Sequence, residues 1–483
     1  MQSSMFNLRV PLAGSDDATG DVFLMNTLSG AQLVVSSDVA QLLERFRESE
    51  NADDLDGEEL DAVTVLREQG FLVSDRTQDR AALDRFFART SADGSELHIT
   101  VLTTLQCNFA CDYCFQGDHG DYNKFAEKMS TETAHRVAAW IERELDRVCP
   151  ERLVVMFFGG EPLLNLPAMY EIAERAWAAT QARGIWMGTS IITNGLLLSG
   201  DVVDRMLTYG LKGVKITLDG DRDTHNRMRP LRGGQGTFDR IVENIRQVAD
   251  RVPISIGGNF DESSVDSYPA LLEFLSQQPF ASKLSKVNFK PVIRNAPVSA
   301  AASGRLAGGL ALIPVGQDNK PLGGTCMTSA GKGHGASGCD SCGSLDDKLG
   351  FLRAETERHG FPTASGVPGG PCHVHMKHAH TIGPDGSLYA CPGFTGEKAL
   401  STGHIDDRRE SWRESARERF ERLHPWDECG ECAYIPVCAG GCLVASHNEL
   451  GDMNMPTCHK RSFESATVAL AHRVAGASQG ELS

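Results

Sequence analysis

Six short apolar runs, separated by amphipathic stretches, constrain the fold of residues 97–292 more than any other feature of the sequence. Each run has the length and composition of a buried strand: LHITVL (97–102), LVVMFF (153–158), TSIIT (189–193), VKITL (214–218), ISIGG (254–258) and KVNFK (286–290). Apolar residues repeat on one helical face in 131–148, with Ser130 as a candidate N-cap, and again in 237–249. Such strand–helix units form parallel strands with right-handed crossovers. We therefore predict an α/β fold, a partial (β/α)6 barrel, whose active site lies at the carboxyl ends of the strands.

Three cysteines lie in one short loop after the first predicted strand. Cys107, Cys111 and Cys114 have the spacing C-x3-C-x2-C. Three thiolates can ligate three irons of a cubane cluster and leave the fourth iron without a protein ligand. Electron-transfer clusters and structural zinc sites usually have four cysteines. The loop therefore predicts an iron–sulfur cluster whose open iron binds something else.

This loop, with Tyr113 directly before the third cysteine, resembles that of the radical SAM superfamily. In that family the open iron chelates the amino and carboxylate groups of S-adenosylmethionine, and one electron from the 4Fe-4S cluster cleaves the sulfonium to a 5'-deoxyadenosyl radical. The resemblance implies that Cys107, Cys111 and Cys114 are metal ligands and catalytic residues, and that Tyr113 belongs to the cofactor site. A reduced structural cysteine cluster is the alternative.

Two further motifs follow later strands. In FFGGEPLL, Gly159 and Gly160 permit close backbone approach, so their carbonyls can receive the cofactor's ammonium with the Glu161 carboxylate beside it. This segment is similar to the amino-group site of the superfamily. Thr193 and Asn194 after the third strand offer polar partners for the ribose, although Asn-Gly is also an ordinary turn.

The segment TLDGDRDTHNRMRP follows the fourth strand. It resembles a segment of peptide-modifying members with Ser-x-Asp-Gly and then His-Asp-x-x-Arg, except that Thr217 replaces the serine and Asn226 the aspartate. Thr217 is thereby assigned to the cofactor site. Arg229 is the candidate partner of the cofactor's carboxylate, because guanidinium binds carboxylate in bidentate fashion. A surface ion pair is the alternative for Arg229.

A second group of cysteines lies in the C-terminal third and comprises Cys372, Cys391, Cys429, Cys432, Cys438, Cys442 and Cys458. Their order resembles the SPASM extension of radical SAM enzymes, which holds two auxiliary 4Fe-4S clusters. The resemblance implies an outer cluster on Cys429, Cys432, Cys438 and Cys458, and an inner cluster on Cys372, Cys391 and Cys442. Some relatives have an eighth cysteine where this chain has Gly366. A zinc ribbon is the alternative, because C-x2-C pairs commonly bind zinc.

Other cysteines and histidines fit more than one role. Cys326, Cys339 and Cys342 lie in a segment (296–345) rich in Ala, Gly and Ser, where they could ligate the inner cluster, contact substrate or perform thiol chemistry. The histidines that follow Cys372 alternate as in a strand, so a metal site or proton path is weighed against plain polar strand positions. They are His373, His375, His378 and His380.

The first 95 residues form a different unit. FNLRVPL and DVFLMNTL predict strands, followed by a helix around 38–47, an acidic connection over 48–60, and a helix and strand ending in LREQGFLVSD. This order resembles the winged-helix domains of peptide maturases, to which a precursor's leader adds a strand; a structural cap is the alternative. The predicted domains are 1–95 (leader recognition), 96–295 (barrel), 296–365 (insertion and bridging segment) and 366–483 (SPASM).

Charge and composition exclude several classes of partner. The chain has 64 acidic and 47 basic side chains, a net charge of -17, which argues against binding nucleic acid. It has no secretory signal pattern and no run of about 18 apolar residues, so we expect a cytoplasmic protein without a membrane partner. Fourteen cysteines in metal-like clusters favour metal binding over disulfides in such a chain.

The resemblance as a whole implies a radical SAM/SPASM maturase that modifies a ribosomally synthesised precursor peptide, with a thioether or carbon–carbon crosslink as the expected product. It also implies S-adenosylmethionine, three 4Fe-4S clusters and an electron donor such as flavodoxin or ferredoxin. Sulfatase maturation is disfavoured, because Pro392 stands where that family has an aspartate. The alternatives are a small-molecule dehydrogenase of the same superfamily and a noncatalytic zinc-dependent peptide-binding scaffold.

Overall fold

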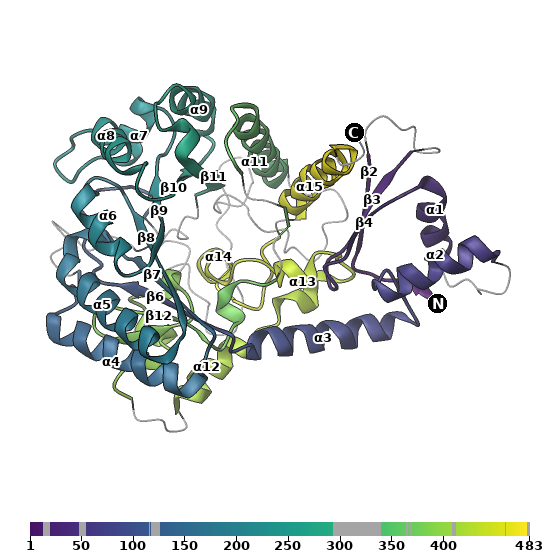
Figure 1. Ribbon diagram of the computed structural model, residues 1–483, viewed down its shortest axis with the longest axis horizontal. Helices are drawn as coiled ribbons and strands as arrows, with labels where there is room; N and C mark the ends of the chain where they lie inside the picture. Colours follow the sequence, from purple (N-terminus) through teal and green to yellow (C-terminus); the bar gives the residue numbers. More distant parts are fainter. Residues whose placement is uncertain are drawn as a thin grey trace, which may run out of the picture.

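The computed structural model describes residues 1–12, 20–47, 55–114, 116, 126–292, 340–363, 366–367, 370–407, 412–458 and 460–480. Most of the predicted insertion after the sixth strand lies outside these residues. Figure 1 shows a sheet-and-helix body joined by the long helix α3 to a smaller N-terminal unit.

A nine-stranded sheet forms the body, in the order β11-β10-β9-β8-β7-β6-β12-β13-β14. All six strands predicted for the barrel are present and pair in parallel, neighbour to neighbour along the chain. They are β6 (Glu96–Leu102), β7 (Arg152–Phe158), β8 (Trp186–Thr193), β9 (Leu211–Thr217), β10 (Ile254–Phe260) and β11 (Leu284–Pro291). The α/β fold with a parallel core is therefore confirmed.

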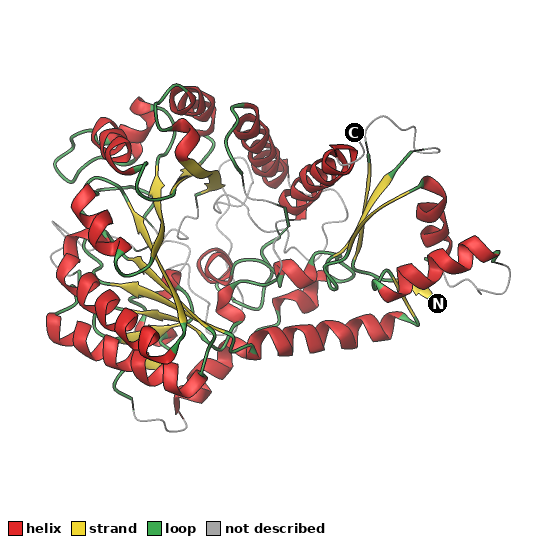
Figure 2. Ribbon diagram, viewed as in Figure 1, coloured by secondary structure: helices red, strands yellow, loops and turns green. Residues whose placement is uncertain are grey.

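Helices follow the barrel strands and cover the sheet, as Figure 2 shows. They are α4 (Thr131–Val148), α5 (Leu166–Arg183), α6 (Gly200–Leu207), α7 (Arg222–Met228), α8 (Phe238–Val248) and α9 (Tyr268–Ser276). Ser130 caps α4 as predicted, because its side chain accepts a hydrogen bond from the Thr133 amide. The main core lies between these helices and the strands, where Val137 and Ile141 of α4 are fully buried with Ile99 and Val155 of the sheet.

The C-terminal segment extends the barrel sheet, which the sequence did not predict. Strand β12 (Ala379–Ile382) pairs in parallel with β6, and β13 (Ser387–Tyr389) and β14 (Gly403–His404) continue antiparallel. The expected strand-like histidine run is wrong in its first half, because His373–His375 forms the 3-10 helix η6. The remaining helices of this segment are α11 (Asp340–Arg358), α12 (Trp412–Glu421), α13 (Ile435–Cys438), α14 (Leu443–Ala445) and α15 (Lys460–Gly480).

The N-terminal unit contains an antiparallel sheet of β2 (Asn7–Pro11), β3 (Val22–Asn26) and β4 (Gln32–Val35), with a separate pair of β1 (Gln2–Ser3) and β5 (Leu72–Val73). Its helices are α1 (Ser37–Arg45), α2 (Gly57–Glu68) and α3 (Arg76–Ala92). The acidic connection ends earlier than predicted, because Asp56 and Glu59 form a capping box that starts α2. Strand β4 and helix α3 were not predicted.

The N-terminal unit docks on the C-terminal segment. Phe87 of α3 stacks on Trp426, with ring centroids 4.3 Å apart, and Arg76 pairs with Glu431 at 2.6 Å. The hydroxyl of Thr27 donates to the backbone oxygen of Ala433. Residues 425–439, which carry three of the predicted cluster cysteines, are thus covered by the first unit of the chain.

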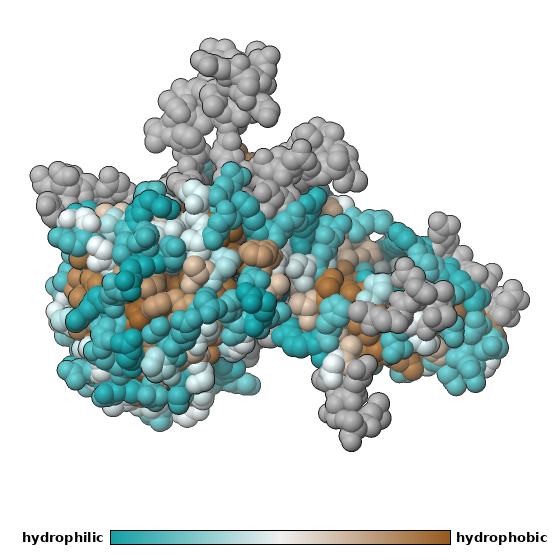
Figure 3. Space-filling view, turned by 90° about the horizontal axis from the view of Figure 1, so that it is seen from above, coloured by the Kyte–Doolittle hydropathy of each residue, from teal (hydrophilic) through white to brown (hydrophobic). Residues whose placement is uncertain are grey.

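The surface shows polar residues over most of the face in Figure 3, with apolar residues visible on both the barrel and the N-terminal unit. Among the described residues, no helix combines the length and the apolar character needed to cross a membrane.

Candidate functional site

The cysteine loop lies beyond the carboxyl end of β6. Cys107 and Cys111 are partly buried and Cys114 is exposed, and none of the three forms a disulfide bond with a described residue. The Phe109 amide donates to Cys107 Sγ at 3.4 Å. Burial raises the pKa of Cys107 to about 12 and that of Cys111 to about 11. Without a metal these thiols are therefore protonated, and ligation to iron would replace the proton.

The chain after Arg229 holds this loop in place. Phe109 and Leu231 form an isolated antiparallel bridge, and the Ala110 amide donates to the Pro230 oxygen at 2.9 Å. The Nε of Arg232 donates to the Cys107 carbonyl at 2.9 Å. Two segments more than a hundred residues apart in sequence are thus fixed side by side.

The double-glycine loop packs against the backbone that leads into the cysteines. The Gly160 amide donates to Thr104 O and the Glu161 amide to Gln106 O, both at 2.9 Å. Gly159 has φ +132, and a Cβ on Gly160 would stand 2.3 Å from Gln106 O. Only glycine allows this close approach, and the group that approaches is the backbone leading into the cysteines. From sequence, the close approach was assigned to the cofactor's ammonium.

Glu161 is fully buried and accepts three hydrogen bonds. They come from the Leu163 amide at 3.0 Å, the Thr193 hydroxyl at 2.8 Å and the Asn194 amide at 2.8 Å. Burial raises the pKa of Glu161, and these three donors oppose that rise. The Thr193 hydroxyl is committed to this carboxylate, so Thr193 acts within the loop network.

Asn194 joins the end of β8 to the cysteine loop. Its Nδ2 donates to Asn108 Oδ1 at 2.7 Å and lies 3.9 Å from Cys107 Sγ, while its Oδ1 accepts from the Leu196 amide at 3.0 Å. The sequence placed Asn194 at a cofactor's ribose, and the structure places it beside Cys107.

A buried ion pair forms at the ends of β9 and β10, beside Tyr113. The Tyr113 hydroxyl donates to Asp219 Oδ2 and accepts from Arg229 Nη1 at 2.6 Å, and the two charged groups are 3.5 Å apart. The Asn259 amide donates to Asp219 Oδ1 at 2.6 Å. The Arg229 side chain is 11% exposed, and its buried Nε has no hydrogen-bond partner among the described residues. The Nε–H group of this guanidinium therefore has no acceptor among the described residues.

His225 positions both members of that ion pair. Its Nδ1 accepts from the Asp219 amide at 3.1 Å, and its Nε2 lies 3.1 Å from Thr237 Oγ1, which itself donates to the Arg229 carbonyl at 2.9 Å. These directions assign the proton to Nε2, so the ring is neutral. Burial lowers the pKa of His225 well below its usual range, and the Arg229 charge adds to this. The neutral imidazole thus holds the backbone of Asp219 directly, and that of Arg229 through Thr237, by hydrogen bonds.

Two of these residues were not predicted as site residues. Asn259 directly follows the predicted fifth strand (254–258) and gave no motif signal, and Asp219 was noted only as the aspartate of the Ser-x-Asp-Gly resemblance. A polar residue directly after a buried strand was the available signal. Thr217, assigned to the cofactor site from sequence, is the last residue of β9 and pairs in register with Gly257 of β10.

Three of the four cysteines of the outer set lie in the segment 425–439, which contacts the N-terminal unit, and Cys458 is the fourth. Burial, together with the neighbouring Cys432 and Cys458, raises the pKa of Cys429 to about 12. Burial likewise raises the pKa of Cys438 to about 12, with contributions from the same neighbours. The four thiols assigned to one cluster therefore lie within electrostatic reach of one another.

The inner set forms a separate group. Burial, together with the neighbouring Cys372 and Cys442, raises the pKa of Cys391 to about 12. The Cys442 amide donates to Thr457 Oγ1 at 2.7 Å, which fixes the backbone beside that thiol. Gly366 has φ +80, and a Cβ there would lie 3.4 Å from Leu470. Cys326 and Cys339, and the side chain of Cys342, lie outside the described residues.

Residues 101–266 match the family model described as the radical SAM superfamily. The match spans the cysteine loop, the double-glycine loop and the Asp219–Arg229 pair. Residues 101–266 are a radical SAM domain. The predicted resemblance to this superfamily is thereby confirmed, and the domain belongs to a superfamily of enzymes.

Curated relatives of the radical SAM domain carry out different reactions. The Fe-coproporphyrin III synthase of Methanosarcina barkeri is 26% identical over 36% of this chain and 40% of its own length. The sporulation killing factor maturation protein SkfB of Bacillus subtilis is 23% identical over 36% of this chain and 38% of its own. The cyclopropyl synthase TigE of Paramaledivibacter caminithermalis is 22% identical over 42% and 46%. The chain thus matches less than half the length of each of these relatives.

Solved structures extend the likeness beyond the radical SAM domain. The structure of anSMEcpe with bound AdoMet and the Kp18Cys peptide covers 79% of this chain and 99% of its own, with a TM-score of 0.53 at 18% identity. At this identity the likeness shows the fold alone.

Proposed function

We propose that the chain is a radical SAM maturase that modifies a ribosomally synthesised precursor peptide. One observation carries the proposal. The carboxyl ends of β6 to β10 bring together the three thiols of the cysteine loop, the buried Glu161 carboxylate, and a buried arginine whose Nε has no acceptor among the described residues. These are the donor types that an iron–sulfur cluster and an amino-acid-bearing cofactor require.

The residues fit the cluster and the cofactor in chemical type. Cys107, Cys111 and Cys114 would ligate a 4Fe-4S cluster, which supplies the electron that cleaves S-adenosylmethionine to an alkyl radical. The buried Nε of Arg229 has no acceptor among the residues that the structure describes, so it suits the cofactor's carboxylate. Glu161 presents a buried negative charge beside the backbone of Gly160, which suits an ammonium.

The second cysteine group supports two auxiliary clusters. We infer an outer cluster on the four thiols of the outer set and an inner cluster on Cys372, Cys391 and Cys442. Crosslinking a peptide removes electrons from it, and the auxiliary clusters would accept the electron lost when the new bond forms. A donor such as flavodoxin or ferredoxin would supply the electron that cleaves S-adenosylmethionine. A thioether or carbon–carbon crosslink is the product that this arrangement favours.

The N-terminal unit supports a peptide as substrate. Strand β4 is an edge of the three-stranded sheet, its side chains are exposed or half-buried, and Val34 is 37% exposed. The other edge, β2, ends in Pro11, which lacks an amide hydrogen, and it packs against α15. We therefore assign leader binding to β4 by strand addition. SkfB, named as a maturation protein, is consistent with this substrate class.

Iron content tests the cluster assignment. The anaerobically reconstituted chain should hold about twelve irons, and the triple variant with Cys107, Cys111 and Cys114 replaced by alanine should hold about eight. Cys149→Ala is the matched control, because Cys149 is an exposed free thiol at the end of α4. The triple variant should also lose S-adenosylmethionine cleavage. Cleavage at the wild-type rate by that variant would exclude this cofactor assignment.

Mass spectrometry tests the substrate class. The protein is co-expressed with each short open reading frame beside its gene, and the mass of each peptide is measured. Loss of a pair of hydrogen atoms from one of them identifies an oxidative crosslink. Unchanged peptides, together with turnover of a small alcohol, would favour the dehydrogenase alternative.

A further inference from the structure

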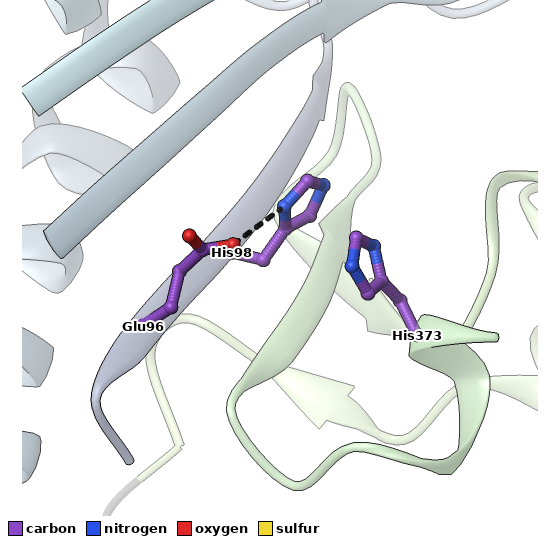
Figure 4. A group of neighbouring side chains, drawn as sticks. All are labelled: Glu96, His98 and His373. Carbon is purple, nitrogen blue, oxygen red and sulfur yellow. Dashed lines mark ion pairs between the residues drawn. The ribbon is translucent and has the colours of Figure 1, made fainter. Parts of the chain in front are cut away.

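A carboxylate and two imidazoles meet at the end of the barrel opposite the cysteine loop. Glu96 and His98 lie on β6, and His373 lies in η6 and points toward them (Figure 4). Alternate residues of a strand share a face, so Glu96 and His98 project to the same side. One ligand atom from each of the three residues lies within 4.8 Å of the others.

The distances between these three side chains show that their potential ligand atoms face one another. His98 Nδ1 lies 3.8 Å from Glu96 Oε1, and the His98 and His373 ring centroids are 4.1 Å apart. Glu96 Oε2 is directed instead to Arg152 Nε, at 3.6 Å. Arg152 therefore orients the carboxylate so that its other oxygen faces the histidines.

His98 has an unsatisfied nitrogen. Its Nδ1 is buried and has no hydrogen-bond partner among the described residues, because 3.8 Å to Glu96 is too long for a hydrogen bond. Buried polar atoms without partners are rare in folded proteins and call for a ligand or an ion.

We propose that Glu96, His98 and His373 bind a zinc ion, with water as its fourth ligand. Imidazole nitrogen and carboxylate oxygen are zinc donors, with bonds of about 2.0–2.2 Å. Tetrahedral ligands at that distance lie about 3.2–3.6 Å apart, so the trio must close by roughly 1 Å. The exposed His373 and the 35% exposed Glu96 side chain have room to rotate.

The ion would tie the C-terminal segment to the first barrel strand. Strand β12 already pairs with β6 in a register that sets Ala379 opposite His98. His373 directly follows Cys372, so zinc would fix the backbone beside a proposed ligand of the inner cluster. That consequence rests on the proposed function, whereas zinc binding by the trio does not.

Zinc content and coordination test the site. The reconstituted enzyme, its iron sites filled, is dialysed against buffered zinc, and zinc and iron are measured by mass spectrometry. We expect the wild type to hold about one zinc more than the double variant H98Q/H373Q, at equal iron content. X-ray absorption should show a nitrogen and oxygen shell at about 2.0 Å, without the sulfur shell at about 2.3 Å that cysteine would give.

Two single variants separate a loss of zinc from a failure of the protein to fold. Glu96→Gln changes only a partly exposed carboxylate and should lower zinc occupancy, while His378→Gln, in the same segment but outside the trio, should leave it unchanged. Equal zinc in the wild type and the double variant, or zinc bound through sulfur, would overturn the proposal. Normal zinc binding in a chain that fails to cleave S-adenosylmethionine would refute the proposed function and leave the zinc site standing.

Discussion

Gly160→Ala tests whether the double-glycine loop and the cysteine loop work as one unit. The added Cβ would stand 2.3 Å from Gln106 O and 2.6 Å from Leu105 O, so the two backbones must separate by about 1 Å to reach ordinary contact. That movement stretches the hydrogen bonds from the Gly160 and Glu161 amides, now 2.9 Å each, beyond useful length.

The cost can be worked from these contacts. Two hydrogen bonds contribute about 1 kcal/mol each, and overpacking costs about 1–3 kcal/mol, which together destabilise the variant by about 3–5 kcal/mol. For a domain of this size the melting temperature falls by about 2–4 °C per kcal/mol, so we expect a decrease of about 6–20 °C. A displacement of 1 Å at the reacting groups costs about 100-fold in rate.

Thermal unfolding and 5'-deoxyadenosine formation by the reconstituted enzyme measure the two effects. Gly57→Ala is the matched control, because a Cβ at Gly57 meets nothing within 4 Å and the residue begins α2. It should unfold at or above the wild-type temperature. A Gly160→Ala variant with wild-type melting and wild-type cleavage would refute the close coupling of the two loops.

Three further predictions address other parts of the chain. Arg229→Met leaves the fully buried Asp219 carboxylate without its cation, which costs about 3 kcal/mol; a melting temperature equal to wild type would contradict this. Burial lowers the pKa of His375 to about 4 from 6.5, so the unfolded chain binds a proton that the native chain does not, and stability is lost as the pH falls from 6.5 toward 4, by about 2 kcal/mol at pH 5. His375→Phe, compared with wild type by melting at pH 7.5 and 5, should remove that part of the pH dependence. Val34→Pro in β4 should weaken leader binding in a fluorescence polarisation assay while uncoupled cofactor cleavage persists, whereas Arg9→Pro on the opposite edge should not; equal binding by both variants would exclude β4 as the docking edge.

Local pattern was enough to predict much of this protein. Buried strands are apolar over their whole length and helices repeat every 3.6 residues, so all six barrel strands and helices such as α4 could be located. The cysteine spacing and the double glycine depend on short-range backbone geometry, so their presence in one site was also predictable from sequence. The division of the C-terminal cysteines into an outer and an inner set followed from family resemblance alone, and it stays a prediction.

Contacts between distant segments were decided only by the tertiary structure. The ion pair of Asp219 and Arg229 is completed by Tyr113 and Asn259, which lie 106 and 40 residues from Asp219 in sequence. The addition of β12 to β6, the docking of Phe87 on Trp426 and the meeting of His98 with His373 have the same character. None leaves a periodic signal, because each depends on how packed elements are brought together in space. The sequence by itself determined which local elements form and which chemistry they carry, and the tertiary structure determined which of those residues meet.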